Sequence, residues 1–193
     1  MKRVALAQAN QRLKAAQEAL SRLNMADSYP SFVRAWSDFL VAANGIYAKL
    51  EQGAKGCGKS EAWFGRKKHD RKKDQLLCYL HHARNADEHG IEPVTSNASS
   101  IAVGGNGVIR RASFDWHEDG SPNIQIDADP GINIVIEAKG KLIGIYDHGD
   151  AYPPPEVHLC VKISDASPKG VGALAIAYFE TILYEADQLP AGP

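Results

Sequence analysis

The chain has 193 residues, of which 44% are hydrophobic and 23% are charged. This length suits one domain, or one domain with a large insertion, and the composition is that of a globular protein and excludes a disordered tail. The 22 Lys and Arg residues nearly balance the 23 Asp and Glu residues, so the net charge of -1 excludes a globally basic nucleic-acid binder but leaves room for a local basic patch.

Cysteine usage and hydropathy bear on where the protein is found. Cys57, Cys78 and Cys160 are far apart and lack CxxC spacing, which argues against a disulfide framework and against a zinc ribbon. The apolar run at residues 4–7 is too short for a signal peptide, and no run approaches the roughly 20 apolar residues that a membrane span needs. We therefore expect a protein of the reducing cytoplasm that has no membrane partner.

Helices are predicted at both ends of the chain. Apolar side chains recur every three or four positions over residues 4–23, 31–52 and 171–189, which places them on one face of each helix. After a glycine-rich break, Ser60 would cap a further helical segment that runs towards Gly90. We expect this segment to be kinked or divided near His69 and Asp70.

The composition changes at about residue 95, where short runs rich in Val and Ile alternate with turn sequences. Strands are expected at residues 101–103, 108–116, 124–127, 132–137 and 157–163. Turns are expected at residues 104–107, 118–122, 129–131 and 139–141. The predicted fold is α+β, with a helical bundle at residues 1–95 plus 168–193 and an antiparallel β-meander inserted before the last helix, at residues 96–167.

The segment at residues 76–90 carries the most informative pattern. At 100° per residue its apolar side chains fill one face, and a polar wall lies opposite with Arg84 at its boundary. The wall consists of His81, His82, Asn85, Glu88 and His89. Asp87 points into the apolar face and should need a hydrogen-bond or ionic partner.

Residues 84–89, Arg-Asn-Ala-Asp-Glu-His, resemble the signature of the higher-eukaryote-and-prokaryote nucleotide-binding (HEPN) superfamily: an arginine followed directly by a polar residue, and a histidine separated from the arginine by four residues. This resemblance implies an α-helical bundle, often a homodimer, with the motif on a helix that lines a cleft. It covers the helices and does not account for the β segment.

The resemblance also implies a metal-independent endoribonuclease that needs no cofactor and whose partner is RNA. It further implies a role as a toxin or defence effector. His89 would be the general acid or base, since an imidazole moves protons at neutral pH. Arg84 would clamp the scissile phosphate, and Asn85 would orient the phosphate or the histidine. The structural alternative is a solvated helix face with Arg84 and Glu88 as an i,i+4 ion pair worth about 0.3–0.5 kcal/mol.

A basic run lies upstream of this segment. It could hold RNA phosphates beside the motif, and Trp63 and Phe64 could stack on bases. The run comprises Arg66, Lys67, Lys68, Arg71, Lys72 and Lys73. Alternatively, these cations only face water while Trp63 and Phe64 lie in the core.

Two other motifs carry less weight. Residues 53–60 satisfy the phosphate-loop pattern GxxxxGK[ST], but a helix and not a strand precedes them, which favours an interhelical linker. A metal is the weaker interpretation of the polar wall, because few of its side chains have the spacing of helical ligand pairs, and we expect none. The polar residues of the β segment are interpreted as turn and strand-face positions without a site: His117, Asp147, His148, Asp150 and His158.

The sequence therefore favours an endoribonuclease. The principal alternative is a non-catalytic module in which the β segment binds a protein or a small ligand. Metal-dependent hydrolysis is a third class.

Overall fold

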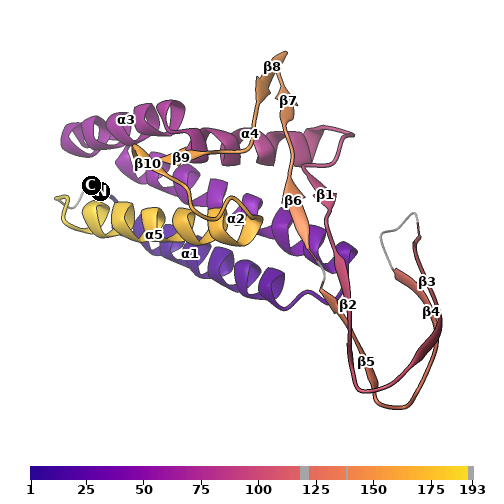
Figure 1. The fold of residues 1–193 in the computed structure, drawn as a ribbon. Coiled ribbons are helices and arrows are strands. Elements are labelled where there is room, and N and C mark those ends of the chain that lie inside the picture. Colours follow the sequence, from indigo (N-terminus) through magenta and orange to yellow (C-terminus); the bar gives the residue numbers. More distant parts are fainter. Residues whose placement is uncertain (118–121, 138, 191–193) are drawn as a thin grey trace.

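The computed structural model describes residues 1–117, 122–137 and 139–190. Within them five helices and ten short strands are arranged in the order of the predicted α+β fold: four helices, a run of antiparallel strands and a final helix. The helices are α1 (Arg3–Asn24), α2 (Tyr29–Ala54), α3 (Gly58–Lys73), α4 (Gln75–His89) and α5 (Pro168–Asp187). The fold class is confirmed (Figure 1).

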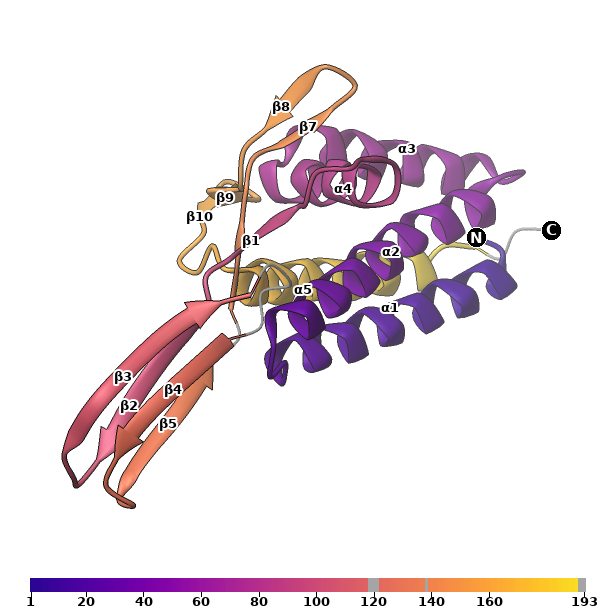
Figure 2. The same ribbon diagram turned by 90° about the vertical axis from the view of Figure 1, so that its right-hand side faces the viewer.

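The helices form a bundle around α2. Helix α1 packs against α2 and α5, and α4 packs against α2 on the side opposite α1 (Figures 1 and 2). The predicted third segment is divided, but at Asp74 and not near His69 and Asp70. Asp74 ends α3 and caps α4, because its carboxylate accepts a hydrogen bond from the Leu77 N–H at 2.9 Å.

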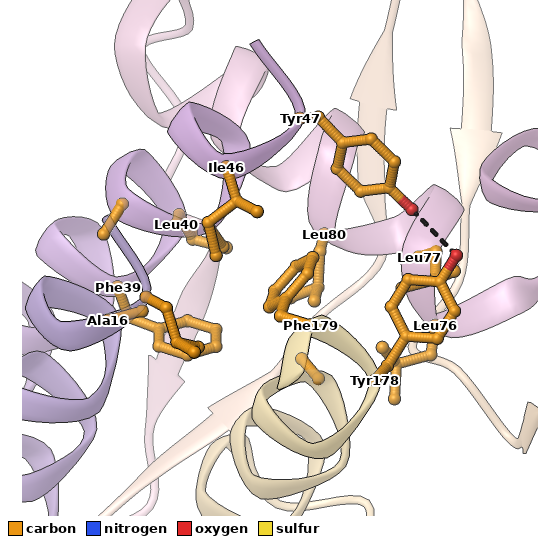
Figure 3. Packing of buried hydrophobic residues seen from close by; sticks show 14 of the residues in the cluster. Ala16, Phe39, Leu40, Ile46, Tyr47, Leu76, Leu77, Leu80, Tyr178 and Phe179 are labelled. Atoms are coloured by element: carbon orange, nitrogen blue, oxygen red, sulfur yellow. Dashed lines mark hydrogen bonds between the residues drawn. The ribbon is translucent and has the colours of Figure 1, made fainter. Parts of the chain in front are cut away.

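Aromatic side chains fill the core of the bundle. Trp36 stacks on Phe39 at 5.2 Å between ring centroids, and Tyr47 meets Phe179 edge to face at 6.0 Å. The Tyr47 hydroxyl donates a hydrogen bond to the Tyr178 hydroxyl at 3.3 Å (Figure 3). Full burial of each such side chain contributes about 1.5–3 kcal/mol, so this cluster fixes α5 against α2 and α4.

The strands occupy the chain between α4 and α5. They are β1 (Thr95–Asn97), β2 (Ser100–Gly105), β3 (Ile109–Trp116), β4 (Pro122–Ala128), β5 (Ile132–Glu137), β6 (Gly140–Leu142), β7 (Ile145–Asp147), β8 (Asp150–Tyr152), β9 (Val157–His158) and β10 (Val161–Lys162). The pairing is antiparallel throughout, as predicted, but it is nested: β1 pairs with β6, β2 with β5 and β3 with β4. It therefore differs from the order of a simple meander.

The nested strands divide the insertion into two parts. Strands β2 to β5 form an arm that extends away from the bundle, while β1 and β6 to β10 lie on it (Figure 2). The arm folds back where Gly105 meets Gly131. Gly105 has a φ of 109°, and a Cβ at this position would overlap the Gly131 carbonyl oxygen, so both the backbone conformation and the close approach favour glycine. Of the turn expected at residues 118–122, residues 118–121 lie outside the described residues, and Pro122 begins β4.

Two local predictions in this region were wrong. Residues 139–141 were expected to form a turn, but Gly140 begins β6, which packs against Phe32 of α2. Residues 157–163 were expected to form one strand, but they form the β9–β10 hairpin, whose turn residues Leu159 and Cys160 have positive φ. Contacts with the bundle determine the structures of β6 and of the β9–β10 hairpin, and these contacts cannot be predicted from the local sequence pattern.

Candidate active site on helix α4

One face of α4 is buried, as the 100° spacing predicts. Five residues of this helix are buried: Leu76, Leu77, Tyr79, Leu80 and Ala83. Asp87 lies partly buried towards α2, and its carboxylate accepts a hydrogen bond from the Ser37 hydroxyl. This hydroxyl is the partner that the sequence required without identifying it.

The opposite face carries a continuous polar network. Asn85 donates from Nδ2 to Asp147 Oδ2 at 3.1 Å, and Arg84 donates from Nη1 to Asn85 Oδ1 at 3.4 Å. The Nδ1 atom of His82 lies 2.7 Å from the same Asp147 oxygen. Asp147 comes from β7, which packs against α4, so the β insertion supplies a residue of the network.

Asp147 was expected to be a turn or strand-face residue without a site; it is the last residue of β7, and its carboxylate is bonded to two side chains of α4. Hydrogen bonds from His82 and Asn85 lower the pKa of Asp147, although burial opposes them. The carboxylate thus stays ionised and holds both side chains. Sequence pattern could not find this residue, because Asn85 and Asp147 are 62 positions apart.

Arg84 and His89 meet at Glu88. The Arg84 guanidinium forms an ion pair with Glu88 Oε2 through Nη2, and His89 Nε2 lies 3.8 Å from that same oxygen. The His89 side chain is 74% exposed, whereas that of Arg84 is 25% exposed. The i,i+4 ion pair of the structural alternative is present, and the two motif side chains also converge on one anionic oxygen.

His81 does not join this network. It lines a cavity of about 20 Å³ between α2, α3, α4 and α5, and its Nδ1 atom is buried without a partner in the described part of the chain. This volume has room for about one water molecule. Burial, followed by the nearby charge of Arg71, lowers the pKa of His81 to about 4, so its ring is neutral at physiological pH.

The basic run is split between two environments. Lys67 pairs with Glu185 at 2.8 Å, Lys68 pairs with Glu51 at 3.1 Å, and Arg71 lies 4.6 Å above the ring centroid of Tyr47. Arg66, Lys72 and Lys73 are exposed. Trp63 and Phe64 are buried in the core, so they cannot stack on bases, and the alternative interpretation of these two residues is confirmed.

Lys72 and Lys73 open onto a cavity of about 420 Å³ next to the network. Its other wall is formed by β8 and the proline connector, with Tyr152, Pro153 and Pro154. Tyr152 also stacks on His82, at 3.6 Å between ring centroids and 10° between planes. Lys72 and Lys73 therefore share a cavity with Tyr152, which contacts the polar network of α4.

The phosphate-loop pattern at residues 53–60 and His158 of the β segment both lie in contacts that support the fold. Residues 53–60 join α2 to α3, and α3 begins at Gly58, so Ser60 lies within its first turn and does not cap it. His158 was expected to be a strand-face residue, but it bonds to Asp74 at 2.9 Å and ties β9 to α4. Within the described ranges, no three His, Cys, Asp or Glu side chains are grouped to hold a metal, and no helix is long and apolar enough to cross a membrane.

On α4, Arg84 and His89 therefore both lie beside one carboxylate oxygen of Glu88, Asn85 is bonded to Asp147, and a cavity lined by Lys72 and Lys73 adjoins Tyr152. A comparison of the chain with protein-family models, with curated proteins and with solved structures found no match.

Proposed function

We propose that the protein is a metal-independent endoribonuclease whose site is the polar face of α4. The observation that supports this most is the convergence of Arg84 and His89 on one carboxylate oxygen of Glu88. Carboxylate and phosphate oxygens are bound by the same donors, so Glu88 occupies the position that a scissile phosphate would take. The resemblance of residues 84–89 to the HEPN signature supports the same assignment.

Each motif residue has a role in this proposal. Arg84 neutralises the charge that builds on the phosphate as it is attacked, through the two-pronged grip of a guanidinium. His89, exposed at the end of α4, transfers a proton to or from the RNA. Asn85 orients the guanidinium, because its amide is fixed by Asp147. A homodimer and a toxin or defence setting belong to the same proposal through the resemblance.

RNA would reach the site along the exposed cations of the basic run. Arg66, Lys72 and Lys73 present positive charge on α3, and the cavity that Lys72 and Lys73 line continues to Tyr152 beside the network. Backbone phosphates bind such cations without regard to base sequence. The proposal therefore includes a salt-dependent RNA affinity.

The test is cleavage of a labelled single-stranded RNA by the full chain in EDTA. We expect His89→Ala to reduce the rate by about 10²-fold or more, the usual contribution of one general acid or base. His117→Ala, which removes an exposed histidine near the end of β3, is the matched control and should cleave as the wild type does. Cleavage that depends on a divalent metal, or that survives in His89→Ala, would contradict the proposal.

Glu88 provides a second test of the same site. If the phosphate replaces the Glu88 carboxylate, then Glu88→Gln removes a competing negative charge and should lower KM for RNA several-fold. A higher KM in this variant would show that the phosphate binds elsewhere. The contrast is informative because removal of a merely structural ion pair would change stability and leave KM unaltered.

A non-catalytic binding module is the second candidate, and the arm provides the observation in its favour. The register of β3 and β4 places Phe114 and Trp116 on the same face as Ile124. Phe114 is 42% exposed and Trp116 is 41% exposed. No RNA cleavage under any condition would favour this function.

A further inference from the structure

His82 and Asp147 form a pair whose geometry is that of an oriented proton acceptor. The imidazole Nδ1 lies 2.7 Å from Asp147 Oδ2, and the two side chains are 18% and 12% exposed. The Tyr152 ring stacks on the imidazole at 3.6 Å, which fixes the plane of the ring. Three elements therefore hold the imidazole: α4, β7 and β8.

Asp147 also determines which nitrogen of His82 is free. Its ionised carboxylate accepts hydrogen bonds only, so the Nδ1 atom that faces it carries the proton and Nε2 of the neutral ring does not. The second hydrogen bond to the same oxygen, from Asn85 at 3.1 Å, keeps the carboxylate in place. A neutral imidazole held in this way presents the lone pair of Nε2 outwards.

The Nε2 atom of His82 is not fully buried. In the described part of the chain, the buried side-chain atoms without a partner belong to Trp36, Arg71, His81 and Arg84. The Nε2 atom of His82 has no hydrogen-bond partner there and is not among these buried atoms. This atom therefore keeps some contact with solvent, while the whole side chain is 18% exposed.

His82 and His89 are seven positions apart on α4, which puts them on the same side of the helix, two turns and about 10 Å apart along its axis. Arg84 is linked to His82 through Asn85 and Asp147, because the Asn85 amide accepts from the Arg84 guanidinium and donates to the carboxylate that faces His82.

We propose that His82 is the general base of the α4 site and that Asp147 is its positioning residue. This inference rests on the proposed ribonuclease function and assigns the second proton-transfer group that such a reaction requires. It also gives the β7–β8 hairpin a purpose, since this hairpin supplies both Asp147 and Tyr152.

The step is a transesterification. The RNA 2′-oxygen gives its proton to Nε2 of His82 and attacks the adjacent phosphorus atom, while the bond from phosphorus to the 5′-oxygen breaks. That oxygen takes its proton from the protonated His89. The products are a 2′,3′-cyclic phosphate and a 5′-hydroxyl, so the step consumes no water, metal or oxidant.

The experiment measures single-turnover RNA cleavage in EDTA across pH for the wild type, His82→Gly and Asp147→Asn. We expect a bell-shaped profile for the wild type, and a loss of about 10²–10⁴-fold for His82→Gly together with loss of the limb that rises with pH. Added imidazole should restore part of the rate in His82→Gly, which a structural role for His82 would not produce. Asp150→Asn, an exposed carboxylate of the same hairpin, is the control and should behave as the wild type.

The outcomes separate the two proposals. If His89→Ala abolishes cleavage while His82→Gly keeps the wild-type rate and pH profile, the assignment of His82 is wrong and the ribonuclease stands. If His82→Gly loses activity but imidazole restores none of it, His82 supports the fold and is not the base. If the wild-type chain does not cleave RNA, both proposals fail.

Discussion

At the residue scale, α4 combines groups that the sequence shows and groups that it hides. The 100° spacing identified most of the buried face of α4, and the i,i+4 spacing of Arg84 and Glu88 anticipated their ion pair. The partners of Asp87 and Asn85 could not be predicted, because Ser37 and Asp147 lie 50 and 62 positions away. A polar residue in an apolar face therefore indicates that a partner exists, but not which one.

The surroundings of His81 could not be predicted from the sequence either, and they lead to a prediction about the stability of the fold. The sequence placed it on the polar wall with His82, but it faces the cavity beside Tyr47 and Phe179. Its folded-state pKa of about 4 lies below the ordinary 6.5, so between these values the unfolded chain binds more protons than the folded chain. The contribution to stability is full above pH 6.5 and is lost as pH falls towards 4.

We therefore expect His81→Gln to flatten the acid limb of the stability profile. Urea unfolding at pH 7 and pH 5 should show the wild type losing about 1–2 kcal/mol more than the variant. The difference between the two proteins isolates His81 from the other histidines. An identical loss in both would mean that the ring of His81 is hydrated in the folded state.

At the element scale, the helices were predictable and the strands only in part. Helices α1, α2 and α5 lie within three residues of the expected bounds, because each carries an apolar stripe and a turn sequence near its ends. The division between α3 and α4 was predicted near His69 and Asp70, but it lies at Asp74. The Asp74 carboxylate that caps α4 also accepts a hydrogen bond from the Leu159 N–H at 2.7 Å, and this contact favours the division at Asp74. That second contact comes from the β9–β10 turn, far along the chain.

Strand β6 is the clearest case in which packing overrides a local turn pattern, and substitution of its first residue, Gly140, tests that packing. A Cβ at Gly140 would overlap the Phe32 ring, so Gly140→Ala should destabilise the fold by about 1–3 kcal/mol. The matched control is Gly65→Ala in α3, where a Cβ would meet nothing within 4 Å and should stabilise the helix by about 0.5–1 kcal/mol. Urea unfolding of both variants gives the two signs, and equal effects would contradict this packing.

At the scale of the whole molecule, one part of the insertion extends away from the bundle and another part packs on it. The arm of β2 to β5 leaves the bundle, whereas β7 and β8 pack on α4 (Figures 1 and 2). The sequence predicted the insertion and its antiparallel pairing, but it could not show which part would reach the motif helix. The residues next to the candidate site come from β7 and β8, which have only three residues each and so carry a weak sequence signal.

The most direct test of the α4 site is the rate of RNA cleavage in EDTA by Arg84→Lys, compared with the wild type under single-turnover conditions. A lysine keeps the positive charge beside Glu88 but lacks the fork that grips two phosphate oxygens. We predict that the variant folds as the wild type does and cleaves at least about 10²-fold more slowly. Equal rates for the two proteins would contradict the assignment of Arg84 as the phosphate clamp.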